Sequence, residues 1–197
     1  HHHFNETFFE DVRVSASNVV GEINRGWYVG ATLLDFERSN ITGAISSRKS
    51  IEKLINYVHS DEGSDRNRLN ESAGLRHQVA DCYIRTEVQF NFSFRIISMQ
   101  SAGQIPNYEA STSKLFNSEL NQNIARTGTQ VLGMYAQFWG HDDDDRNTYN
   151  DPPNDYAPLD GIFTQNYVRS VPSTIAAGTS EIQRNIIATR GLGLPRG

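Results

Sequence analysis

Glu37 is the residue whose type and position point most directly to chemistry. It lies in the stretch L-L-D-F-E-R-S, residues 33–39, in the middle of an apolar helical stripe. A carboxylate in such a place loses water, and desolvation raises its pKa towards the range of a useful general base. The alternative is a buried ion pair with Arg38 or Arg48, which the spacing alone favours.

A second candidate site is the start of a helix near the C-terminus. The segment A-G-T-S-E-I-Q-R-N, residues 177–185, runs from a small, hydroxyl-bearing turn into a helix. The hydroxyls of Thr179 and Ser180, with the free backbone amides of a helix start, could bind an anion or another polar ligand. The alternative is an ordinary helix cap, which the residue types alone favour.

Three other features are not expected to carry chemistry. His141 and the acidic run 142–145 lack the ligand spacing of a calcium loop, so we expect a solvated loop and no metal site. Cys82 has apolar neighbours at helical spacing and is expected in the core. Residues 1–3 are all histidine, resemble the remainder of a purification tag and take no part in the fold prediction.

The bulk composition excludes several classes of protein. No stretch of the 197 residues approaches the roughly 20 apolar residues of a membrane span. The net charge of −5 argues against a nucleic-acid partner bound through phosphate neutralisation. A single cysteine permits no internal disulfide and fits a reducing compartment, so we expect a cytoplasmic protein.

Helical periodicity dominates the chain from Trp27 onward. Apolar residues recur at helical spacing and predict helices at about 27–59, 69–102, 108–139, 160–171 and 180–190. Ser180 with Gln183 fits a capping box at the start of the last helix. The apolar positions that share a face with Glu37 on the first helix are Gly30, Leu33, Leu34, Ile41, Ala44, Ile45, Ile51, Ile55 and Val58.

The segment before the first helix has a different pattern. F-N-E-T-F-F-E-D-V-R-V-S, residues 4–15, is rich in aromatic and β-branched residues and predicts one β-strand at 8–14. Nothing later in the chain looks like its partner. The predicted fold is all-α, an antiparallel up-and-down helical bundle preceded by one residual β-strand.

Five stretches together resemble the acyl-CoA dehydrogenase family. They are F-F-E-D-V-R-V-S (8–15), V-V-G-E-I-N-R-G-W (19–27), L-D-F-E-R (34–38), Q-V-L-G (130–133) and A-G-T-S-E-I-Q-R-N-I-I-A-T-R-G-L-G-L-P (177–195). The resemblance implies that residues 4–26 end a middle β-domain and its linker. Residues 27–197 would form the C-terminal helical bundle domain, and the strand at 8–14 would pair with a sheet outside this chain.

The function implied by the resemblance is FAD-dependent α,β-dehydrogenation of an acyl-CoA thioester. In that reaction a carboxylate removes the α-proton while the flavin takes the β-hydride. Many members carry the base just before the glycine of the G-T-S motif, where this chain has Ala177. Members similar to the isovaleryl and long-chain enzymes instead place it on the first long helix, before an arginine. The resemblance therefore implies Glu37 as the catalytic base, with Arg38 beside the substrate.

The resemblance also assigns cofactor-binding residues. The segment that contacts FAD in relatives matches Thr179, Ser180, Glu181 and Gln183, with Arg184 in a more structural role. Gln130 and Gly133 match part of a motif that touches the FAD of a neighbouring subunit, although Met134 replaces its second glycine. Relatives carry an R-x-x-F-G segment between the first two helices, and residues 60–75 lack it.

An intact base beside an incomplete contribution to the neighbour's cofactor suggests an unequal pair of chains. Such α2β2 assemblies include bacterial enzymes that act on CoA-linked sterol side chains. The implied partners are an acyl-CoA, an electron-transfer flavoprotein or similar acceptor, and a homo- or hetero-tetramer. Two other functions stay open: a flavin oxidase or monooxygenase on the same scaffold, and a non-catalytic helical partner subunit. We expect the chain alone to bind FAD poorly and to be inactive.

Overall fold

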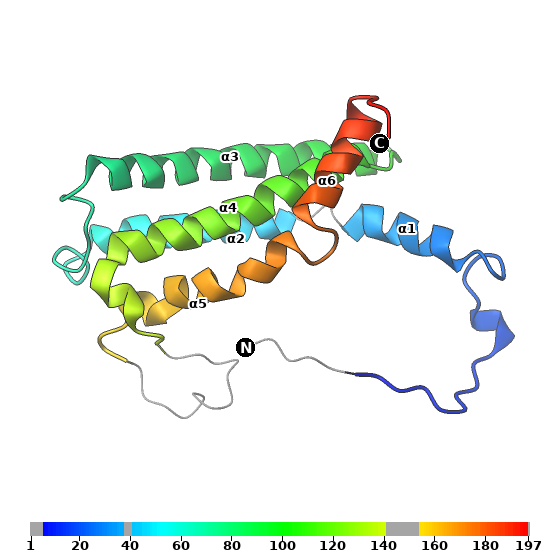
Figure 1. Cartoon of the computed structure of the whole chain (residues 1–197), viewed down its shortest axis with the longest axis horizontal. Coiled ribbons are helices and arrows are strands. Elements are labelled where there is room, and N and C mark those ends of the chain that lie inside the picture. The colour runs from blue at the N-terminus through cyan, green and yellow to red at the C-terminus, as the bar shows by residue number, and fades with distance from the viewer. Residues whose placement is uncertain (1–5, 38–40, 141–153, 197) are drawn as a thin grey trace.

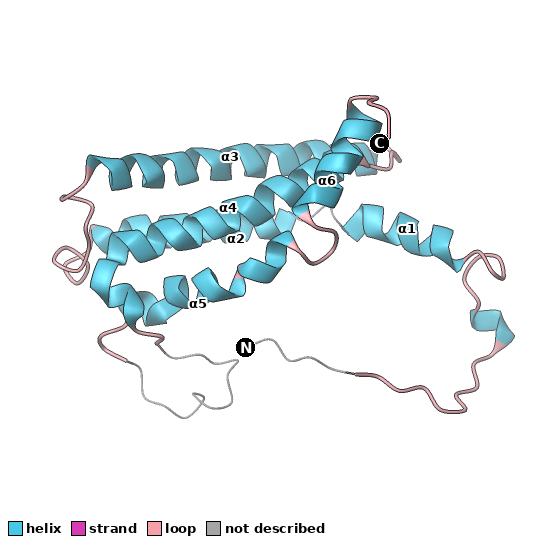
Figure 2. Ribbon diagram, in the orientation of Figure 1, coloured by secondary structure: helices cyan, strands magenta, loops and turns pink. Residues whose placement is uncertain are grey.

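The computed structural model describes residues 6–37, 41–140 and 154–196, and within these ranges it contains helices and loops but no strand (Figure 2). The main helices are α1 (Gly26–Glu37), α2 (Ile41–Val58), α3 (Ala73–Ser101), α4 (Tyr108–Leu132), α5 (Ile162–Arg169) and α6 (Ser180–Ile186). Short 3₁₀ turns lie at η1 (Ala16–Asn18), η2 (Gly133–Gln137), η3 (Pro158–Gly161) and η4 (Val171–Thr174), and a π-helical turn follows α6 at Ile187–Gly191. The all-α prediction is confirmed.

The bundle is built from α2, α3 and α4, and α3 runs antiparallel to both α2 and α4 (Figure 1). Helix α4 is the central element, because it packs against α2 and α3 and also against α5 and α6. One apolar cluster fills the interior, and its buried members are Ile51, Leu54, Tyr57, Val58, Val79, Cys82, Leu120, Ile124, Val131, Leu132 and Phe163. Several of them are the positions that helical spacing predicts.

Helix α5 lies close to α4 because α4 has a glycine at the contact. A Cβ at Gly128 would lie within van der Waals overlap of the ring of Phe163, which is fully buried. Any larger side chain at this position would push α5 away from the core. The glycine therefore fixes the distance between the two helices.

The predicted strand at residues 8–14 is wrong for the chain as described. Residues 6–15 have no regular structure, and Phe8 and Phe9 are 78% and 80% exposed. A strand needs a neighbour to pair its backbone N–H and C=O groups, and the described residues offer none. High β propensity alone does not hold this segment extended in a sheet.

Helix α1 lies beyond the end of the bundle (Figure 1). The helix predicted over 27–59 is described as α1 and α2, and residues 38–40 between them lie outside the described ranges. The apolar stripe of α1 is uncovered, since Trp27 is 80% and Leu33 66% exposed. Along α2 the stripe turns into the core, where Ala44 and Ile51 are fully buried.

None of the helices within the described ranges is long and apolar enough to cross a membrane.

Candidate active site

The start of α6 is capped by Thr179. This residue has extended backbone angles, and its hydroxyl accepts a hydrogen bond from the N–H of Ile182 at 3.3 Å. The predicted capping box of Ser180 and Gln183 is therefore wrong, because Ser180 is the first helical residue and not the cap. The shift by one residue releases both side chains for other contacts.

The turn that precedes the cap is held by two side chains. Ala177 and Gly178 have positive φ values of 54° and 92°. The side-chain nitrogen of Gln183 donates to both of their carbonyl oxygens, at 3.2 Å each, and Gln183 is fully buried. The ammonium of Lys114 on α4 also donates to the carbonyl of Gly178, at 2.6 Å. These contacts stabilise a backbone conformation that alanine adopts at a cost.

Two buried polar atoms beside this turn have no hydrogen-bond partner among the described residues. They are the hydroxyl oxygen of Ser180 and the amide oxygen of Gln183. A buried polar atom without a partner costs about 1–3 kcal/mol, so each is ready to pair with a polar group supplied from outside this part of the chain.

Glu181 adds a negative charge at the same helix start. Its side chain is 78% exposed. A hydrogen bond from its own backbone N–H, followed by one from Thr179, lowers the pKa of this carboxyl. Helix α6 is joined to α4 by an ion pair between Arg184 and Glu119, in agreement with a structural role for that arginine.

Glu37 is the last residue of α1, while Arg38 and the side chain of Glu37 lie outside what the structure describes. The bundle nevertheless fixes where α2 begins. A Cβ on Gly43, near the start of α2, would lie 2.7 Å from the side chain of Asn117 on α4. Asn117 is one helical turn from Lys114, whose ammonium contacts Gly178. The start of α2 and the start of α6 therefore lie at the same end of the bundle (Figure 1).

Gln130 and Gly133 lie elsewhere. They stand at the C-terminal end of α4, and the eleven residues from Glu119, the partner of α6, to Gln130 rise about 16 Å along the helix. One chain therefore does not bring Gln130 and Gly133 together with the 179–183 segment. That the two sets of residues touch two different flavins stays a prediction.

The chain's own loop covers Gly133. A Cβ on this residue, which has φ +57°, would lie 2.7 Å from the Cδ of Arg68. The backbone N–H of Arg68 donates to the carbonyl of Val131 at 2.8 Å, so the loop between α2 and α3 closes over the end of α4. This loop is the segment that lacks the R-x-x-F-G motif.

The sequence did not single out Lys114 or Arg68. Each contacts a residue more than 60 positions away in the sequence, and no local sequence pattern predicts such a contact. The same is true of a partly buried polar cluster between α2 and α4, in which the hydroxyl of Ser47 donates to the side-chain oxygen of Asn121 at 2.6 Å and the side-chain oxygen of Asn117 lies 3.3 Å away.

The remaining candidates are simpler. Cys82 is 2% exposed, as predicted; burial raises the pKa of its thiol, and the hydroxyl of Thr127 lies 3.6 Å from its sulfur. The segment 141–145 lies outside the described ranges. Within those ranges no group of three or more histidine, cysteine, aspartate or glutamate side chains could hold a metal ion.

Comparisons with known proteins give the chain its family. The model of the family described as acyl-CoA dehydrogenase, C-terminal domain, matches residues 24–192. The acyl-CoA dehydrogenase FadE26 of Mycobacterium tuberculosis is 29% identical over 194 residues, which cover 96% of this chain and 45% of that protein.

Two solved structures have the same fold. A variant of the Tcur3481–Tcur3483 steroid ACAD is 25% identical with a TM-score of 0.76, over 96% of this chain and 46% of the other. The ChsE4–ChsE5 complex from Mycobacterium tuberculosis is 27% identical with a TM-score of 0.70, over 96% and 45%. This chain thus spans less than half the length of the relatives it matches. The match to the family model over most of the chain shows that it belongs to the acyl-CoA dehydrogenase family, where it corresponds to the C-terminal domain.

Proposed function

We propose that this chain is the C-terminal part of an FAD-dependent acyl-CoA dehydrogenase and carries its catalytic base, Glu37. The observation that carries the proposal is the meeting of two elements at one end of the bundle. The helix that ends in Glu37 reaches the same end as the turn and helix start at 177–183. A base and a cofactor segment must meet in this way if one substrate is to contact both.

In the proposed reaction, the main contribution of this chain is to position one carboxylate. The carboxylate of Glu37 takes the proton from the α-carbon of the thioester, and Arg38 lies beside the substrate. Ala177, at the other place where the family carries a base, has a methyl group that accepts no proton. Bound FAD would supply the two-electron acceptor for the hydrogen that leaves the β-carbon. Exclusion of water from Glu37 would raise its pKa towards neutrality, as a general base requires.

The residues at the start of α6 fit a polar cofactor. The unpartnered hydroxyl of Ser180 is a hydrogen-bonding group without a protein partner. The backbone N–H groups of the first helical turn point towards the same side as the cap at Thr179. Thr179, Ser180, Glu181 and Gln183 would hold FAD there. Because this chain supplies one segment of the site only, we expect it to bind FAD poorly and to be inactive alone.

The opposite end of α4 supports an unequal pair of chains. Arg68 occupies the space beside Gly133. In relatives the residues that match this position contact the flavin of a neighbouring subunit, so Arg68 would stand between Gly133 and that flavin. The similarity to the ChsE4–ChsE5 complex supports a partner of the same family, and the similarity to a steroid ACAD supports a sterol-derived acyl-CoA as substrate. We propose a hetero-tetramer that passes electrons to an electron-transfer flavoprotein or similar acceptor in the cytoplasm.

The test uses the full-length protein, purified with and without a second dehydrogenase chain. We expect a flavin spectrum that bleaches when a suitable acyl-CoA is added without oxygen, and stable reduced flavin when air is admitted with product bound. Rapid reoxidation by air would indicate an oxidase or monooxygenase. A protein that holds no flavin under any condition would contradict the proposal and favour a non-catalytic partner subunit.

A further inference from the structure

The turn at Ala177 and Gly178 has a backbone conformation that needs support. Both residues have positive φ values, 54° and 92°, and alanine adopts such values only at a cost in free energy. The turn directly precedes Thr179, the cap of α6, so it sets the direction in which the chain enters that helix. Any contact that fixes the turn therefore also fixes the segment 177–183.

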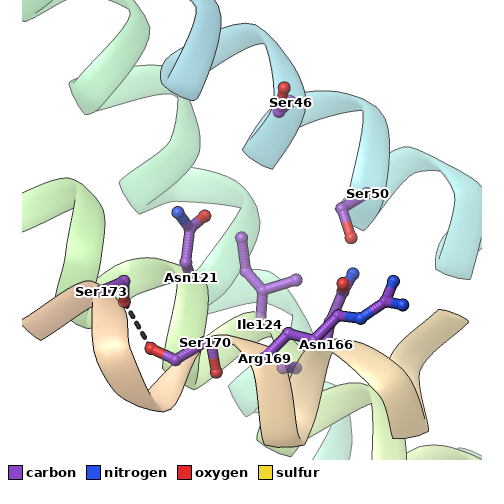
Figure 3. A pocket seen from close by; sticks show the side chains of 9 residues that line it. Ser46, Ser50, Asn121, Ile124, Asn166, Arg169, Ser170 and Ser173 are labelled. Carbon is purple, nitrogen blue, oxygen red and sulfur yellow. Dashed lines mark hydrogen bonds between the residues drawn. The ribbon is translucent and has the colours of Figure 1, made fainter. Parts of the chain in front are cut away.

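The chain is already fastened to α4 before it reaches the turn. The side-chain nitrogen of Gln122 on α4 donates to the carbonyl of Ser170 and to the hydroxyl oxygen of Thr174, at 3.2 Å each. The hydroxyl of Ser173 donates to the same carbonyl, and both serines line a pocket of about 290 Å³ beside α4 (Figure 3). Two residues, 175 and 176, separate this anchored stretch from the turn.

Beyond the turn, α6 is fastened to α4 by an exposed ion pair. Arg184 pairs with Glu119, and their side chains are 53% and 43% exposed. Exposed ion pairs contribute little to stability because water and salt screen them. This contact therefore holds α6 near α4 but does not fix the turn itself.

Lys114 acts on the turn directly. Its ammonium, partly buried on α4, donates to the carbonyl of Gly178 at 2.6 Å, and hydrogen bonds from a charged donor are stronger than those between neutral groups. The position of Lys114 is itself fixed, because the neighbouring Ser113 is 3% exposed and accepts a hydrogen bond from Gln89 on α3 at 2.9 Å. The contact thus ties the turn to the core of the bundle.

Gln183 transmits this constraint to the polar atoms of the segment. Its side-chain nitrogen donates to the carbonyls of Ala177 and Gly178, so the position of the Gly178 carbonyl determines how the amide is turned. A Cβ on Gly178 would lie 2.6 Å from that nitrogen, so the two residues pack closely. The amide oxygen of Gln183 has no hydrogen-bond partner among the described residues, and its direction is fixed by the same contacts.

We infer that Lys114 is a positioning residue for the proposed flavin segment. By fixing the carbonyl of Gly178, it holds Gln183 and Ser180 in the orientation in which they would meet the cofactor. Lys114 acts through this turn and not by contact with the cofactor. The inference rests on the proposed function, because FAD is the ligand that the segment would hold. Small displacements of a binding group lose much of its interaction, so loss of Lys114 should weaken flavin binding.

The experiment uses the full-length protein, purified with its second dehydrogenase chain if it requires one. Flavin is removed and added back, and its dissociation constant is measured for wild type, Lys114→Met, Lys114→Arg and Lys53→Met. Lys114→Met keeps the length of the side chain but removes the donor, while Lys114→Arg keeps a charged donor. Lys53, an exposed lysine of α2, is the matched control. Lys114→Gln, which keeps a neutral donor, replaces Lys114→Met if that variant does not fold.

We expect Lys114→Met to weaken flavin binding at least about tenfold, the scale of one charge-assisted hydrogen bond, and Lys114→Gln to weaken it by a smaller factor. Lys114→Arg should stay within about threefold of wild type and Lys53→Met within about twofold. Hydrogen–deuterium exchange of the flavin-free protein gives a readout that needs no cofactor. In Lys114→Met the peptide that contains residues 177–183 should exchange faster, while the rest of the bundle should not change.

The outcomes separate this inference from the proposed function. Flavin affinity equal to wild type in Lys114→Met, or in its replacement, would overturn the inference and leave the proposed function intact. Equal losses in Lys114→Met and Lys114→Arg, with faster exchange throughout the bundle, would show a general packing role and would also overturn it. A wild type that binds no flavin would contradict the proposed function and this inference together.

Discussion

The two ends of α4 both lie beside residues that match cofactor-binding motifs of the family, but they differ in how those residues are packed. At one end, Lys114 and Gln183 hold the 177–178 turn and leave polar atoms beside it without partners. At the other end, the side chain of Arg68 packs over Gly133. The end beside α6 keeps polar atoms without hydrogen-bond partners, while the end at Gly133 is covered by the loop between α2 and α3. A site is therefore identified by what its residues leave open, as well as by which residues match a motif.

The largest effect on stability is expected at the open end. Gln183→Leu would remove a fully buried amide that donates to the carbonyls of Ala177 and Gly178, which costs about 3 kcal/mol of unfolding free energy and about 6–12 °C in Tm. Thermal and urea unfolding measure the loss. Gln78→Leu, at an exposed position on α3, is the control and should change stability little. A Gln183→Leu chain as stable as the wild type would contradict the role of this amide.

A somewhat smaller effect is expected at the closed end. Gly133→Ala introduces a Cβ at positive φ and against Arg68, with a cost of about 2 kcal/mol. The double variant with Arg68→Ala separates the two causes, because removal of the arginine relieves only the contact. Urea unfolding of the four proteins gives the coupling energy between the two sites. Strict additivity would show that Arg68 does not cover Gly133.

The cap of α6 can be tested with a pair of neighbouring hydroxyls. Thr179→Ala removes the hydrogen bond to Ile182 and should cost about 1 kcal/mol. Ser180→Ala removes a buried hydroxyl without a described partner and should leave stability unchanged or slightly raised. In the flavin-loaded full-length protein, Ser180→Ala should weaken flavin binding more than Thr179→Ala does if Ser180 contacts the cofactor. Equal losses of stability in both variants would contradict the assigned cap.

The smallest expected effect is on the stability of the folded chain at acidic pH. The folded-state pKa of Glu181 is lowered, first by its own backbone N–H and then by Thr179, so its ionised form is favoured in the folded chain. Its stabilisation is present above the unfolded pKa and is lost as pH falls through the lower folded value. Glu181→Gln should flatten the pH dependence of stability between about pH 5 and pH 3. Urea unfolding across this range measures it, and an unchanged profile in Glu181→Gln would contradict the shift.

Periodicity predicted the elements that are buried along one face. Helix α3 begins and ends within four residues of the predicted range, and Leu120, Ile124 and Val131 lie in the core. The prediction for α4 runs too far because Gly133, with φ +57°, ends the α-helix. Hydrophobic spacing is reliable here because the core itself imposes it.

Periodicity does not predict burial at positions that need a neighbouring element to cover them. Phe94 and Leu33 occupy apolar positions of their helices, yet they are 49% and 66% exposed, and the strand at 8–14 does not form. The site was predictable in its segments, since short motifs mark 177–183 and the helix end at Glu37. Its supports were not, because the contacts of Lys114 and Arg68 join distant parts of the chain.

The measurement that tests the central claim most directly is anaerobic flavin reduction in the full-length protein. Wild type, Glu37→Gln and the control Glu10→Gln, an exposed carboxylate outside the bundle, would be mixed with the same acyl-CoA. We predict that Glu37→Gln bleaches at least about 100-fold more slowly, the lower bound for loss of a general base, while Glu10→Gln matches wild type. Equal bleaching in wild type and Glu37→Gln would contradict the account and place the base elsewhere.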